Sequence, residues 1–178
     1  MHPRLQDVLA PTESARAELL AVLETLTPAQ WEQRARAGGW TVRQLVGHLA
    51  TVEDGAIRAL FRTFRNARAA GLAQETSTES LAHSLDYARI PDANTKIEAP
   101  AMTLAPDETT VDELRARLAK GREGLRTFCA EADGFALGEP TFPHPVLGPI
   151  SLYQWVLFIG LHELRHLRQL RGILADPA

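Results

Sequence analysis

The segment SLYQWVLFIGLHELRHLRQLRG, residues 151–172, predicts a long helix and with it a helical fold. Ser151 and Gln154 have the spacing of a capping box, in which two side chains satisfy backbone N–H groups at the start of a helix. Gly172 is a natural end for this helix. The first half of the segment is apolar on almost every side. We therefore expect it to be deeply buried or to pair with a second subunit, which predicts a homodimer.

The same signals predict three further long helices upstream. Two of them open with capping boxes, Thr41 with Gln44 and Thr110 with Glu113. The third is expected to start at Thr12. The expected ranges are 12–26, 41–71 and 110–133. A short extra helix is predicted after Thr27 and Pro28. No segment alternates clearly between apolar and polar residues, so no strand is predicted.

A long polar connection separates the second and third of these helices. It covers residues 71–109 and contains Pro91, Pro100 and Pro106. Short loops make neighbouring helices antiparallel, whereas a connection of this length permits a crossover that leaves the two helices parallel. The predicted fold is all-α, a four-helix bundle with up-down-down-up topology. It forms a single domain over residues 1–178, in which the second and fourth helices run antiparallel.

Composition excludes several classes of protein. The net charge of -3 gives no reason to expect a nucleic-acid partner, which would favour a basic patch. The longest apolar stretch, residues 156–161, is far too short to span a bilayer, and no signal-peptide core is visible, so a cytoplasmic location without a membrane partner is expected. Cys129 is the only cysteine, which excludes an intramolecular disulfide and a thiolate-rich metal site.

His162, Glu163 and His166 match the pattern H-E-x-x-H of zinc proteases. There, two histidines one turn apart hold a metal and the glutamate acts as general base. A catalytic zinc needs a third protein ligand, which these proteases usually take from further downstream. The extended pattern fails here, because Gln169 and Gly172 occupy its glycine and last histidine positions. If a metal binds, its third ligand must come from upstream.

His48, in LVGHLA at residues 45–50, is the candidate for that ligand. His162 and His166 differ by about 40° in direction around a helix, so they share one face. Antiparallel pairing brings the start of the second helix against the end of the fourth, where His48 can reach the pair. An isolated pair of histidines is more often without a ligand. The convergence of three in one bundle predicts a metal site.

Three segments together resemble the DinB-like superfamily of bacterial helical-bundle proteins. They are GGWTVRQLVGHLA at 38–50, HPVLGPISLYQWVLF at 144–158 and HELRHLRQLRGI at 162–173. The resemblance implies a four-helix bundle, often a homodimer, with a divalent metal held at His48, His162 and His166. Glu163 stands where the family often has Asp or another residue. The protease pattern is then a coincidence of that substitution.

Some members of that family resemble enzymes that use a low-molecular-weight thiol such as bacillithiol or mycothiol. We therefore expect a metal-dependent enzyme that activates such a thiol for S-transfer to a small electrophile, with zinc or nickel as the metal. Two alternatives stay open, a metal-dependent hydrolase and a non-catalytic stress-response protein whose metal only stabilises the bundle. The sequence does not identify a catalytic residue.

Residues near the predicted site carry weaker expectations. Glu163 points about 80° away from the mean direction of the two neighbouring histidines, so it is expected to orient a neighbour or face solvent. Gln169 is expected to bond a ligand or support the site, and Trp155 to wall a pocket or simply pack. His144 is expected in a loop. A stripe of arginines is expected to be solvated, namely Arg165, Arg168 and Arg171.

Overall fold

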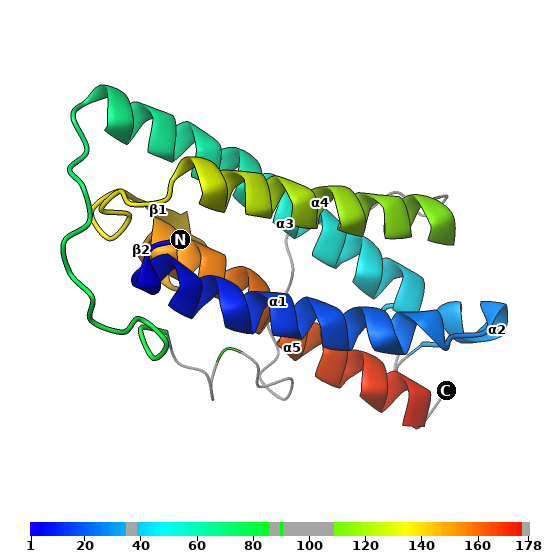
Figure 1. Cartoon of the computed structure of the whole chain (residues 1–178). Helices are drawn as coiled ribbons and strands as arrows, with labels where there is room; N and C mark the ends of the chain where they lie inside the picture. Colours follow the sequence, from blue (N-terminus) through cyan, green and yellow to red (C-terminus); the bar gives the residue numbers. More distant parts are fainter. Residues whose placement is uncertain (35–38, 86–89, 91–108, 176–178) are drawn as a thin grey trace.

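Three of the four long helices begin with capping boxes in this computed structural model (Figure 1). The structure describes residues 1–34, 39–85, 90 and 109–175. The side chains of Thr41 and Gln44 each accept the other's backbone N–H at the start of α3. The same exchange opens α4, and a similar one between Ser151 and Gln154 opens α5. These helices span Val42–Ala69, Val111–Glu131 and Leu152–Ala175. All three predicted starts are confirmed.

The first helix, α1, begins nearer the N-terminus than its predicted start at Thr12. It spans Pro3–Glu24 and contains Pro11 in its interior. An interior proline removes one backbone hydrogen bond and usually breaks a helix, which is why the local signal pointed to a later start. Here tertiary packing overrides that signal. The Thr12 hydroxyl lies 2.8 Å from the carbonyl oxygen of Val8 and 2.9 Å from that of Val156 in α5.

A short helix and a hairpin complete the described part of the fold. The predicted extra helix is present as α2, Pro28–Trp31, capped by Thr27. A hairpin that the sequence did not predict precedes α5. Its strands β1, Thr141–His144, and β2, Gly148–Ser151, pair antiparallel. Each strand has only four residues and contains a proline, so its alternation is too short to stand out from a loop.

The four long helices have the predicted up-down-down-up topology. Figure 1 shows α1 and α5 running in one direction and α3 and α4 in the other. Helix α1 packs against α5, and α3 packs against both α4 and α5. The start of α3 therefore lies at the same end of the bundle as the end of α5. Of the predicted crossover, Pro91, Pro100 and Pro106 lie outside the described residues.

Two apolar clusters fill the interior, and every long helix contributes to both. The cluster at the hairpin end includes Leu5, Val8, Leu60, Phe64, Leu125, Phe128, Tyr153 and Val156. The cluster at the opposite end includes Leu19, Leu23, Leu45, Leu49, Leu114, Leu118, Leu167 and Leu170. Along each helix, six to eleven residues, or about two to three turns, separate the two sets. The buried charged residues Arg16, Glu53, Arg122 and Glu163 lie in this gap.

The apolar first half of α5 is covered by the chain itself. Every residue from 152 to 161 is buried except Gln154, which is partly exposed. The feature that suggested a homodimer is thus explained by the core of one chain. The homodimer stays a prediction that light scattering would test. Across the described part of the chain, no helix combines the length and apolarity needed to cross a bilayer.

Gly160 marks a close approach of α1 to α5. A Cβ atom added there would lie 2.6 Å from the Cα of Thr12. We expect Gly160→Ala to lower the free energy of unfolding by about 1–3 kcal/mol, because the backbone of α1 must move away. Urea unfolding measures this. Gly172→Ala is the matched control on the same helix, since no atom lies within 4 Å of the added methyl group. It should stabilise by up to about 1 kcal/mol, and equal effects would contradict the close approach.

Candidate metal centre

The structure brings together the three histidines that the sequence singled out. His48 projects from α3, and His162 and His166 project from α5. The Nε2 atom of His162 lies 3.3 Å from Nε2 of His48 and 3.0 Å from Nε2 of His166. One ligand atom from each residue can be chosen so that all three lie within 4.8 Å of one another. Three imidazole nitrogens at this spacing can surround a single metal ion.

The environment keeps two of these imidazoles, those of His162 and His166, uncharged. His48 and His166 are buried, whereas His162 is partly exposed. Burial, reinforced by the charge of His48, lowers the pKa of His166 to about 3. Burial, reinforced by the charges of His166 and His48, holds the pKa of His162 well below its ordinary value. A metal ligand must present a lone pair, so rings that stay neutral near pH 7 are suited to binding.

Gln169 fixes the orientation of one ligand. Its side-chain oxygen lies 2.6 Å from Nδ1 of His166. A carbonyl oxygen can only accept a hydrogen bond, so Nδ1 carries the proton and Nε2 keeps its lone pair towards the other two rings. The sequence left open whether Gln169 bonds a ligand or supports the site. The structure shows it supporting His166.

Gln169→Leu should weaken zinc binding by about 10–100-fold, because the ring of His166 loses the bond that selects its tautomer. A competition titration against a chromophoric chelator measures the change in dissociation constant. Gln169→Glu is the matched control, since it keeps an acceptor oxygen and should retain most of the affinity. Equal zinc affinity in Gln169→Leu and the parent protein would show that the bond has no role in ligation.

Aromatic rings flank the three histidines. Trp40 lies 4.9 Å from the ring of His48 and 6.4 Å from that of His166, measured between centroids. Phe158 stacks on His162 at 5.3 Å. These rings restrict how the imidazoles can turn. The only ligand left partly open to solvent is His162, so a small molecule reaches the centre most directly from its side.

His144 is in a different setting from the one expected, whereas Trp155 takes one of its two expected roles. His144 lies in β1 and not in a loop, and its Nδ1 atom accepts backbone N–H groups of Val146 and Leu147 at 3.1 Å each. Its ring contacts Phe158 at 4.3 Å between centroids. Trp155 stacks on Phe142 at 4.2 Å. Of its two expected roles, packing is the one the structure supports.

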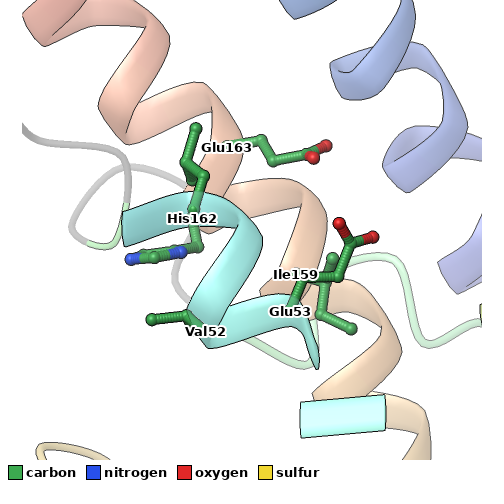
Figure 2. A pocket seen from close by; sticks show the side chains of 6 residues that line it. Val52, Glu53, Ile159, His162 and Glu163 are labelled. Atoms are coloured by element: carbon green, nitrogen blue, oxygen red, sulfur yellow. The ribbon is translucent and has the colours of Figure 1, made fainter. Parts of the chain in front are cut away.

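Glu163 does not belong to the metal centre. Figure 2 shows its carboxylate leaving α5 on a different side from the ring of His162. The residue is 2% exposed, so the expectation that it faces solvent is wrong. One of its oxygens accepts a hydrogen bond from Arg16 and the other accepts one from Arg122. Because both oxygens are held by arginines, Glu163 is unavailable as the general base of a protease.

Glu163 is part of a buried charge network that the sequence analysis missed. The network consists of Arg16 from α1, Glu53 from α3, Arg122 from α4 and Glu163 from α5, with side chains at most 4% exposed. Arg16 donates from Nε to Glu163 at 2.7 Å and from Nη2 to Glu53 at 2.5 Å. Nη2 of Arg122 lies 2.9 Å from Oε2 of Glu163 and 3.5 Å from Oε1 of Glu53. Two positive and two negative charges therefore balance in the interior.

A small cavity separates His162 from the carboxylates of the network. It is lined by Leu49, Val52, Glu53, Ile159, His162 and Glu163 (Figure 2). Its volume of about 10 Å³ is close to the space that one water molecule needs. This cavity is too small for a substrate. Its lining is mostly apolar and includes His162 of the metal centre and both carboxylates of the network.

One arginine of the predicted solvated stripe is also buried. Arg165 is 6% exposed, and its Nη1 atom lies 3.5 Å from the carbonyl oxygen of Ile90. Arg168 and Arg171 are exposed, as expected. Arg165 therefore contacts the segment that crosses over between α3 and α4.

Comparisons with known proteins match this chain over most of its length. The model of the DinB superfamily matches residues 12–170, a range that includes all three histidines. The protein YuaE of Bacillus subtilis (strain 168) is 28% identical over 162 residues, covering 89% of this chain and 92% of YuaE. The crystal structure of TT2238, described as a four-helix bundle protein, is similar with a TM-score of 0.64. That match has 25% sequence identity and covers 94% of this chain and 98% of TT2238.

Proposed function

The chain belongs to the DinB superfamily, and on that premise we propose that it is a metal-dependent enzyme that activates a low-molecular-weight thiol for S-transfer to a small electrophile. The observation that carries the proposal is the convergence of His48, His162 and His166 at one point. Metal sites in helical bundles are built in this way, from side chains that facing helices direct into the core.

The three residues fit a divalent metal ion. Imidazole nitrogens suit zinc and nickel equally well, so availability would decide between them. Neutral ligands leave the ion its full positive charge, and three of them leave coordination positions free. When bound, such an ion favours the thiolate form of a thiol, which is the nucleophilic form. Zinc or nickel is therefore the proposed cofactor.

The protein's own residues supply position and access. Gln169 holds His166 in the tautomer that exposes Nε2. Trp40 and Phe158 pack against the imidazoles and keep water from their faces. The partly exposed side of His162 is where we expect the thiol to enter.

The first test is metal content. Protein purified without a histidine tag should carry about one zinc or nickel ion per chain by mass spectrometry, as expected for a single three-histidine centre. Protein that stays metal-free after incubation with zinc and nickel salts would overturn the proposal.

The second test is turnover. Metal-loaded protein is incubated with chlorodinitrobenzene and with bacillithiol, mycothiol or glutathione in turn, and the thioether product is followed by absorbance. We expect product formation that stops on chelation and returns with added metal. Cleavage of an ester without thiol would favour the hydrolase instead. Absence of both reactions, with lower stability after metal removal, would favour a structural metal in a non-catalytic stress-response protein.

A further inference from the structure

The helices that carry the metal ligands also carry the two buried carboxylates. Glu163 directly follows His162 in α5, and Glu53 lies five residues after His48 in α3. Five residues of helix correspond to about 7.5 Å along the axis. On both helices the charge network therefore lies within about two turns of a histidine ligand.

The two arginines belong to α1 and α4, and each donates a hydrogen bond to the backbone of the other helix. Arg16 of α1 donates from Nη1 to the carbonyl oxygen of Leu118 in α4, at 2.6 Å. Arg122 of α4 donates from Nη1 to the carbonyl oxygen of Thr12 in α1, at 3.1 Å. Helices α1 and α4 thus hold both guanidinium groups in place. Arg16 donates to carboxylates on both α3 and α5, whereas Arg122 donates to the carboxylate on α5 and forms an ion pair with the one on α3.

Stability is a weak explanation for such a network. Removing four charged groups from water is costly, and buried ion pairs can often be replaced by apolar residues of similar volume without loss of stability. Unlike apolar contacts, the hydrogen bonds of this network form only when donor and acceptor are aligned. Gly121 shows how closely Glu53 is confined, because a Cβ atom there would lie 2.9 Å from its Oε2 atom.

A metal centre requires more accurate helix positions than an apolar core does. Sliding a helix by one residue moves it about 1.5 Å and turns it about 100°. Metal–ligand distances tolerate only about 0.2 Å. Apolar side chains of about the right size pack acceptably in several arrangements. Charged side chains with fixed donors and acceptors pair well in far fewer arrangements.

We propose that the buried charge network sets the register of α3 against α5 and so positions the three histidines, with Arg16 as the central positioning residue. Arg16 contacts both carboxylates through one planar guanidinium group, so it links the helix of His48 directly to the helix of His162 and His166. This inference rests on the proposed metal site.

The main test replaces the whole network with apolar residues of similar volume, Arg16→Met, Glu53→Leu, Arg122→Leu and Glu163→Met together. We expect the urea midpoint of the metal-free protein to stay the same or rise. Zinc should bind at least about tenfold more weakly, because the ligands lose their common register. The visible absorption bands of bound cobalt(II) should change as well. Unchanged zinc affinity and an unchanged cobalt spectrum would overturn the inference.

A second variant decides the matter if the fourfold replacement does not fold. Arg16→Lys keeps the charge but lacks the planar fork that reaches both carboxylates. Its control is Phe64→Leu, a core truncation on α3 about 24 Å along the axis from His48. Both are titrated with zinc and cobalt(II) at a temperature where both are folded. We expect Arg16→Lys to bind more weakly than the control and to alter the cobalt spectrum. Equal behaviour of the two would overturn the inference.

The parent protein separates this inference from the proposed metal site. Parent protein that binds neither zinc nor cobalt(II) overturns both proposals. Parent protein that binds metal, with all network variants binding equally well, overturns only the positioning role.

Discussion

His48→Ala should lose tight metal binding, with zinc affinity lower by more than about 100-fold. His48 is the only one of the three histidines that α3 contributes, so its removal leaves two ligands on one helix. Two imidazoles do not make the three-ligand centre that a catalytic zinc ion requires. Metal content by mass spectrometry and a chelator competition titration measure the loss.

The control is His83→Ala, which removes an exposed histidine outside the three. It should keep the metal content of the parent protein. If His48→Ala still carries about one zinc ion per chain, the metal binds elsewhere and the three-histidine centre is wrong. The H-E-x-x-H pattern would then have to find its third ligand somewhere other than α3.

The sequence was sufficient to predict the fold because its strongest signals are local. A threonine or serine followed three residues later by Gln or Glu satisfies backbone N–H groups without help from the rest of the chain, and α3, α4 and α5 begin where these boxes predict. The start of α1 could not be predicted in this way. Pro11 disfavours a helix locally, and only packing on α5 outweighs it.

The histidine centre could be inferred from spacing and topology together. The one-turn spacing of His162 and His166 places them on one face, and the antiparallel pairing brings His48 to the same end. The sequence did not predict that Gln169 accepts a hydrogen bond from His166, because bonding a ligand was an equally open role. The formation of this bond depends on side-chain rotamers that spacing alone does not determine.

The charge network was missed because its partners are far apart in the sequence. Arg16 and Glu163 are separated by 147 positions, and Arg16 and Glu53 by 37. Charged residues are almost never fully buried unless they are paired, so the sequence alone predicts an exposed position for each of them. A signal did exist. Arg16 and Glu53 occupy positions that continue the apolar stripes of their helices, with Leu19 and Leu49 one turn away. A charge at such a position predicts a buried partner.

Glu163→Gln should lower the free energy of unfolding by about 3–5 kcal/mol, because it breaks a buried ion network from one side. Arg16 and Arg122 would then share a single buried carboxylate, that of Glu53, in an interior where water cannot compensate. Urea unfolding of the metal-free protein measures the loss. Glu18→Gln is the matched control. Glu18 of α1 forms an ion pair with Arg171 of α5, and both side chains are about half exposed. This substitution should cost less than about 1 kcal/mol.

The same variant decides the meaning of the H-E-x-x-H pattern. In a zinc protease, the glutamate takes a proton from water, so Glu163→Gln would abolish peptidase activity and leave stability nearly unchanged. Here the carboxylate is bonded to arginines and lies away from the histidines. We therefore expect the folded fraction of Glu163→Gln still to bind zinc, with an affinity lowered only as far as the broken network disturbs the histidines, and to keep much of any thiol-dependent turnover, measured at low temperature. A stable Glu163→Gln protein that has lost a peptidase activity would restore the protease interpretation, because the carboxylate would then be needed for the chemistry and not for the fold.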